Sequence, residues 1–217
     1  KLEQYEQLFN ERLELFANLL KEMPVTWSGD TRTALNDQRV YPPTQGGHIK
    51  TWVAVGGTPQ SVVRAAHYGM PLMLAIIGGD PASFKPLADL YRRALVEFGK
   101  QPLPIGVHSP GHIAETDEQA REELYPHYAA MHTQIGRERG WPPLTREGFD
   151  QLAGTNGAMC VGAPETVAWK IAQTAKHLGL SRFDLKYSSG TLPHEAMLRS
   201  IDLYATQVVP RVRELLA

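Results

Sequence analysis

The chain has 217 residues, of which 42% are hydrophobic, and its formal net charge is −1. Such a chain can bury a sizeable core. Its balanced charge, without basic blocks, argues against nucleic acid and anionic membranes as partners. Cys160 is the single cysteine, so no internal disulfide can form, which suits a reducing compartment. No apolar run has the length of a membrane span and no signal-peptide layout begins the chain, so we expect a cytoplasmic protein.

The N-terminal part predicts one helix and one long connection. Apolar residues recur every three or four positions through 1–22, which indicates an amphipathic helix. Residues 24–49 are rich in Gly, Pro, Asn and Asp and predict an irregular loop, of a length that often covers or lines a site. The chain begins at Lys1 inside the predicted helix, which suggests a fragment of a longer protein.

The rest of the chain repeats one unit, a short apolar strand followed by a turn and a helix. Parallel pairing through helical crossovers is expected of such a pattern, so we predict an α/β fold with a mainly parallel sheet. The predicted strands cover 51–56, 71–77, 104–113 and 182–187, and the predicted helices cover 59–68, 81–98, 116–139, 164–179 and 194–215. Thr116 and Gln119 form the pattern of a capping box, and residues 141–160 are expected to be a loop or insertion.

The turn after the first of these strands is the strongest candidate for an anion site. Gly56 and Gly57 precede Thr58, a good N-cap residue, and Pro59, which suits the first helical position. Free amides at a helix start, with glycines in front of them, let a phosphate approach the backbone. An ordinary βα turn that binds nothing has the same pattern.

Most common catalytic motifs are absent from the sequence. No Gly-x-Gly-x-x-Gly, phosphate loop or Gly-x-Ser-x-Gly motif occurs, and one cysteine cannot form a zinc cluster. We expect no metal site. Among the eight histidines, His108 and His112 share one face of a predicted strand with Pro110, so they would line a pocket if that face is the interior of a barrel.

Several segments together resemble the bacterial luciferase-like, FMN-dependent monooxygenases. The similarity extends over the whole chain, in order and with matching spacing. The segments are PVTWSG at 24–29, VYPP at 40–43, WVAVGGTPQSVVRAAHYGMPLMLAIIGGDP at 52–81, AETDEQA at 114–120, VGAPETVAWKI at 161–171 and GTLPHE at 190–195.

The resemblance implies a TIM-barrel fold, the (β/α)8 type, in which this chain supplies strands five to eight as a single domain over 1–217. The first four strands and several active-site groups of the family domain would lie upstream. The chain alone is therefore expected to be catalytically inactive, because four strands cannot close a barrel.

The resemblance also implies a flavin site. Family members bind the FMN phosphate at positions that match Gly56, Gly57, Thr58 and Ser61. The isoalloxazine ring would lie against Ala75, Ile76, Ile77, Gly78 and Gly79. His108 stands where relatives present a basic residue, and we predict it as the catalytic residue, whereas Pro110 departs from the histidine of some relatives. Lys186, Tyr187 and Ser188 match the family only loosely.

By this resemblance the protein would be an oxidoreductase that uses reduced FMN and oxygen on a small organic substrate. The FMN would be reduced in place, or reduced FMN would be supplied by a NAD(P)H-dependent flavin reductase. The oligomeric state is left open, and a homo-oligomer is compatible with the resemblance. A deazaflavin-dependent hydride-transfer enzyme and a non-catalytic flavin-binding relative are the alternatives. The sequence does not name the substrate.

Overall fold

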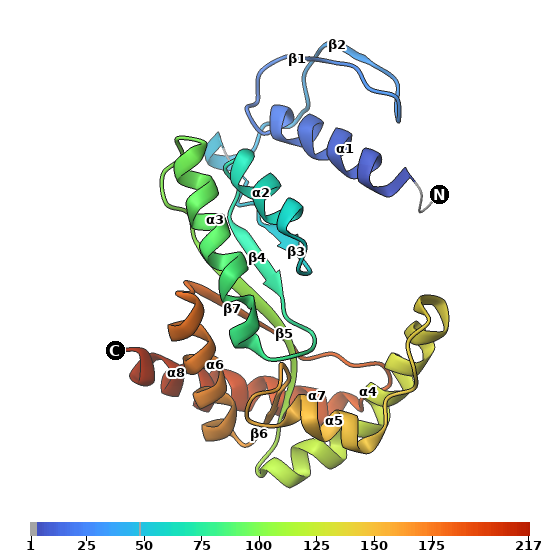
Figure 1. Ribbon diagram of the computed structural model, residues 1–217, viewed down its shortest axis with the longest axis vertical. Helices are drawn as coiled ribbons and strands as arrows, with labels where there is room; N and C mark the ends of the chain where they lie inside the picture. The colour runs from blue at the N-terminus through green and yellow to red at the C-terminus, as the bar shows by residue number, and fades with distance from the viewer. Residues whose placement is uncertain (1–3, 48) are drawn as a thin grey trace. The chain divides into compact units, whose positions relative to one another are not determined.

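The computed structural model describes residues 4–47 and 49–217, which form two compact units, 1–51 and 52–217 (Figure 1). The first unit contains helix α1 (Tyr5–Leu19), a two-stranded antiparallel ribbon and a 3-10 turn. The ribbon and turn are β1 (Val25–Trp27), β2 (Leu35–Gln38) and η2 (Gln45–Gly47). The predicted N-terminal helix is confirmed from Tyr5, and its first three residues lie outside the described part.

The prediction of an irregular connection over 24–49 is wrong for the ribbon. Val25 and Trp27 alternate with an exposed Thr26, and they pack with Leu15 of α1 into a small buried cluster. A strand of three residues is too short for its alternation to be read from sequence. Glu22 fixes the far end of the connection, because its Oε1 accepts hydrogen bonds from the Thr44 amide at 2.6 Å and the Thr44 hydroxyl at 2.5 Å.

The second unit is a five-stranded sheet whose paired strands all run parallel. The strands are β3 (Val53–Val55), β4 (Leu72–Ala75), β5 (Ile105–Ile113), β6 (Cys160–Gly162) and β7 (Arg182–Lys186). The long strand β5 is the centre, since it pairs with β4 through residues 105–108, with β7 through residues 106–110 and with β6 through residues 111–113. The four predicted strands and their parallel pairing are confirmed.

The five predicted helices form with changes at their ends, and the structure adds one further helix over Arg146–Ala153. They are α2 (Pro59–His67), η3 (Pro81–Phe84) with α3 (Lys85–Glu97), α4 (Asp117–Arg139), α5 (Arg146–Ala153), α6 (Pro164–Leu178), and α7 (His194–Leu203), η4 (Tyr204–Val208) and α8 (Val209–Leu216). Helices α2 and α3 lie side by side along β3 and β4 (Figure 1). A π-helical turn at η4 interrupts the last predicted helix.

The capping box predicted at α4 forms only in part. The Thr116 hydroxyl oxygen accepts a hydrogen bond from the Gln119 amide at 3.1 Å, as a cap should. The Gln119 side chain does not return to Thr116, because its amide donates to Glu123 Oε1 at 2.8 Å. The hydrogen bond expected from the Gln119 side chain to the Thr116 backbone is therefore replaced by the Gln119–Glu123 hydrogen bond within the helix.

The segment predicted as a loop over 141–160 contains helix α5 and ends at strand β6. A strand of three residues, Cys160–Gly162, carries too little pattern to be recognised, and it exists because the extended end of β5 offers it a partner. Lys170 of α6 holds the intervening loop, because its ammonium donates to the carbonyls of Gly154 at 2.6 Å and Met159 at 2.5 Å.

Buried residues of α2, β4 and α3 pack in the N-terminal part of this unit, and two further buried clusters lie in the rest of it. One gathers α4, α5 and β6 around Phe149 and Leu124, and the other gathers β6, α6 and the C-terminal helices around Ile113 and Val167. Cys160 is buried in the second cluster, and burial raises the pKa of its thiol to about 11. Within residues 4–47 and 49–217, we find no helix that combines the length and the apolar character needed to cross a bilayer.

Candidate functional site

The register of the parallel sheet brings the candidate cofactor residues to one edge. Val55 pairs with Leu74, and Ala75 pairs with His108, so β3 and β4 end side by side. The Ile76 amide continues the ladder with a 3.0 Å hydrogen bond to the His108 carbonyl. The turns 56–58 and 77–79 therefore leave the sheet at neighbouring points, as expected for the carboxyl ends of parallel strands.

Both turns leave their backbone open. A side-chain carbon at any of the four glycines would meet no atom within 4 Å; they are Gly56, Gly57, Gly78 and Gly79. Gly57 has φ +134° and Gly79 has φ +75°, conformations that side chains rarely adopt. A planar or anionic ligand can therefore reach the main chain at both turns, and two of the positions require glycine.

The start of α2 keeps its first amides available. Thr58 has the extended backbone of an N-cap residue, but its hydroxyl donates to Ser61 Oγ at 2.8 Å and caps no amide. The prediction that Thr58 is the N-cap residue is confirmed, but its hydroxyl caps no amide because it donates to Ser61. The Ser61 amide is satisfied by the Thr58 carbonyl at 3.1 Å. The helix has no acidic residue in its first turn, so the positive end of its dipole is not neutralised there.

The apolar residues after β4 divide between core and surface. Ile76 is fully buried, and its carbonyl accepts a hydrogen bond from the buried Ser109 hydroxyl at 2.9 Å. Ile77 is 52% exposed, and Ala75 is partly buried. Ala75 and Ile77 therefore offer an apolar surface at this edge of the sheet, whereas the side chain of Ile76 belongs to the buried core.

His108 lies at the centre of this edge. It pairs in register with Ala75 of β4 on one side and with Asp184 of β7 on the other, and its side chain is partly buried. Next along β5, Pro110 pairs with Lys186 at the end of β7. Tyr187, 43% exposed, and the exposed Ser188 follow directly.

His112 does not share the position of His108, although both lie on the same strand. Its imidazole is fully buried, and its Nε2 lies 2.8 Å from Glu123 Oε2 of α4. The other oxygen of Glu123 accepts from Arg199 of α7 at 2.5 Å. Burial lowers the pKa of His112, although the Glu123 carboxylate acts in the opposite direction. His112 is thus a buried link between β5, α4 and α7, and nothing in the sequence indicated Glu123 or Arg199 as its partners.

The described residues, 4–47 and 49–217, contain no group of three or more His, Cys, Asp or Glu side chains arranged to hold a metal ion.

Open glycine turns at the carboxyl edge of a parallel α/β sheet are typical of nucleotide- and flavin-binding proteins. The sequence matches the model of a particular family, described as luciferase-like monooxygenase, over residues 1–182. The chain belongs to this family. No curated protein sequence is similar enough to count as a match.

Solved structures share the fold. The monooxygenase RslO1 from Streptomyces bottropensis is 24% identical, with a TM-score of 0.79 over 97% of this chain and 62% of that one. The oxygenating constituent of 3,6-diketocamphane monooxygenase from Pseudomonas putida, in complex with FMN, is 15% identical, with a TM-score of 0.71 over 95% and 63%. A coenzyme F420-dependent tetrahydromethanopterin reductase from Methanopyrus kandleri is 16% identical, with a TM-score of 0.61 over 94% and 62%. The chain thus spans less than two thirds of the length of these relatives.

Proposed function

We propose that the chain functions in a flavin-dependent oxidoreductase that uses reduced FMN and oxygen on a small organic substrate. The observation that carries this proposal is the meeting of two open glycine turns at one edge of the sheet, in a chain of the luciferase-like monooxygenase family. We further propose that the chain corresponds to strands five to eight of the family's (β/α)8 barrel.

The residues at the edge fit the two ends of FMN. The amides of Gly57 and Thr58, with the paired hydroxyls of Thr58 and Ser61, would hold the phosphate at the positive end of α2. The open backbone of Gly78 and Gly79 leaves room for a flat ring. Small and aliphatic groups of the same run suit the apolar face of that ring. When bound, reduced FMN supplies the electrons that activate oxygen.

The chain's own residues have three tasks in this proposal. The turn at 56–58 anchors the phosphate and so fixes where the ring lies. Ala75 and Ile77 shield the ring from water on one side, which a reactive flavin needs. His108 pairs in register with Ala75 and Asp184, and its imidazole is the group that would give or take a proton beside the flavin ring.

A deazaflavin cofactor is the second candidate. The Methanopyrus kandleri relative is described as coenzyme F420-dependent, and its fold is as fully covered by this chain as that of the FMN complex. The open turn at 56–58 would accept either cofactor, because each carries a phosphate. A relative that binds flavin without turnover is the third candidate, and it differs from the others only in activity.

Titration of the purified chain with FMN, riboflavin and F420, followed by flavin absorbance and fluorescence, tests the proposal. We expect saturable FMN binding that is at least about tenfold tighter than riboflavin binding, since riboflavin lacks the phosphate. Tighter binding of F420 would favour hydride transfer instead. No saturable binding of any flavin would refute the cofactor site.

Turnover is measured by NAD(P)H oxidation and oxygen consumption with a flavin reductase present. Because the chain spans 62% of the first relative, a version extended to the relatives' length is assayed beside it. We expect turnover only from the extended version. Flavin binding without turnover in both versions would favour the non-catalytic alternative.

A further inference from the structure

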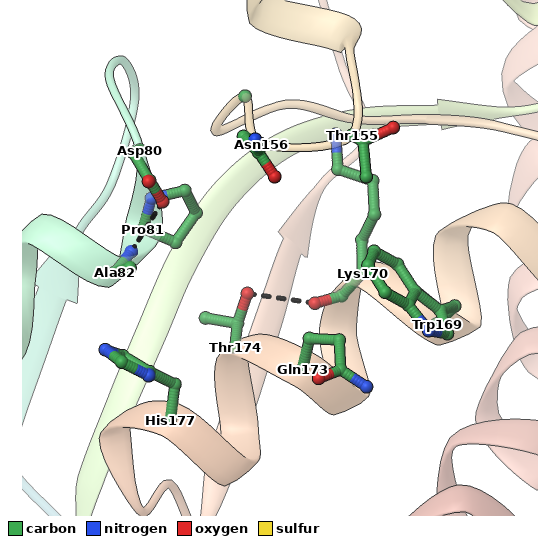
Figure 2. A pocket seen from close by; sticks show the side chains of 11 residues that line it. Asp80, Pro81, Ala82, Thr155, Asn156, Trp169, Lys170, Gln173, Thr174 and His177 are labelled. Carbon is green, nitrogen blue, oxygen red and sulfur yellow. Dashed lines mark hydrogen bonds between the residues drawn. The ribbon is translucent and has the colours of Figure 1, made fainter.

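A cavity of about 250 Å³ lies between α6, the turn that begins η3 and the loop between α5 and β6 (Figure 2). Its lining includes Asp80, the residue that follows the second glycine turn, but none of the residues assigned above to flavin. The side chains that surround the cavity come from three separate parts of the chain, so the cavity is formed by tertiary packing and is not an irregularity of a single loop.

The floor of the cavity is built around a buried ammonium. Lys170 is 5% exposed, and its Nζ lies within hydrogen-bond distance of the carbonyls of Ala153 at 3.3 Å, Gly154 at 2.6 Å and Met159 at 2.5 Å. An ammonium has three donors, so these three carbonyls use all of them. The lysine therefore fixes the loop to α6 and preforms the cavity, but it has no donor left for an anionic ligand.

The walls carry polar groups that are not used within the protein. Asn156 and Gln173 contribute carboxamides, and neither forms a side-chain hydrogen bond with any residue in the described part of the chain. Asp80 uses Oδ1 to accept from the Ala82 amide at 2.8 Å, which leaves its other oxygen free. Figure 2 shows Asp80 and Asn156 across the hollow from Gln173. Such carboxamides and carboxylates suit hydroxyl groups, because a hydroxyl both donates and accepts.

Trp169 adds an apolar wall to this polar set. Its side chain is 42% exposed and lines the cavity, although an indole of this size is more often covered. The face of an indole ring packs well against flat C–H surfaces. With a volume somewhat below the usual range for drug-sized ligands, the cavity suits a molecule with a single ring.

We propose that this cavity binds a neutral, polyhydroxylated molecule of monosaccharide size, with its ring against Trp169 and its hydroxyls on Asn156, Gln173 and Asp80. Phosphates and other anions are disfavoured, since the ammonium of Lys170 has no donor left and the carboxylate of Asp80 lies at the wall; His177, which also lines the cavity, is the one imidazole among the described residues of the lining.

Three methyl hexosides, of the gluco, galacto and manno configurations, serve as probes in titrations followed by tryptophan fluorescence and ligand-observed NMR. We expect at least one to bind saturably with a Kd on the order of 1 mM, as befits so small a ligand. Trp169→Ala and Asn156→Ala should each weaken that binding at least about fivefold. Asn156 is exposed, so its replacement tests the site without disturbing the core.

Trp141→Ala is the matched control, because Trp141 is 39% exposed and lies outside the cavity. It should leave the affinity unchanged. Saturating FMN should also leave it unchanged, so this site and the flavin site can fail independently. Absence of saturable binding for all three hexosides up to about 100 mM, displacement by inorganic phosphate, or full affinity in both cavity variants would overturn the proposal.

Discussion

The proposed phosphate site at the turn of residues 56–58 leads to a quantitative prediction for Gly56. This residue has an ordinary backbone conformation and open space where a side chain would point, so it accepts substitution without strain. Its neighbour Gly57, at φ +134°, would be strained by any side chain, and a loss of binding there could not be assigned to charge. Gly56→Asp and the neutral, equally large Gly56→Asn therefore form the better pair.

The size of the effect follows from Coulomb's law. Two unit charges about 6 Å apart repel by roughly 0.7 kcal/mol in water and by roughly 2.8 kcal/mol at an effective dielectric constant of about 20. The site is open to solvent on one side, so we expect a value between these limits, near about 1.4 kcal/mol, or about tenfold in Kd. Gly56→Asp should weaken FMN binding by about that factor relative to Gly56→Asn.

Fluorescence titrations of both variants with FMN and riboflavin provide the measurement. The penalty should be present for FMN, absent for riboflavin and smaller at high salt, because screening reduces the repulsion between exposed charges. Thermal unfolding of the two variants should agree with that of the parent chain. Equal FMN affinities in the Asp and Asn variants, with unchanged melting, would falsify the placement of the phosphate.

Three further predictions concern polar contacts that stabilise the second unit. The pKa of the buried His112 is lowered, so the unfolded chain binds a proton at this site more readily than the folded chain does. The free energy of unfolding should therefore fall as the pH drops below about 6.5. In His112→Gln the decrease in the free energy of unfolding between pH 7.5 and 5.5, measured by urea unfolding, should be smaller. Asp117 accepts from the Ala163 amide at 2.7 Å and the Thr166 hydroxyl at 3.1 Å, so Asp117→Ala should cost about 1–2 kcal/mol in the same assay, and an unchanged midpoint would contradict this cap. Lys170→Met should cost at least about 2 kcal/mol, because it leaves buried carbonyls unpaired, and a neutral outcome would show that water replaces the ammonium.

The sequence predicted the strands and helices whose ends are marked by glycine pairs, cap residues or proline. The runs before Gly56 and Gly78 end at glycine pairs and are followed by cap and proline, and both became β-strands followed by helical turns at the expected places. The antiparallel ribbon of residues 25–38 and strand β6 were missed, because each strand depends on a partner elsewhere in the chain. Short strands of this kind are decided by tertiary pairing and not by local pattern.

For the candidate site, the sequence predicted which backbone segments lie together but not which side chains pair. Parallel pairing sufficed to place the turns after β3 and β4 beside each other and beside His108. Pairings between side chains could not be read in this way, since no local spacing links His112 to Arg199, 87 residues further on by number. The same limit explains Thr58, whose hydroxyl had the choice between an amide and the nearby Ser61.

The pairing of β5 with three neighbours has a consequence for how the fold opens. Its partners come from residues 72–75, 160–162 and 182–186, so no segment of the chain completes the strand by local contacts. Pairings across such separations slow folding, and strands that belong to one cooperative unit lose their protection together. Amide exchange should accordingly be slowest along residues 105–113, and a cut in the chain between β5 and β7 should abolish protection on both sides of the cut at once.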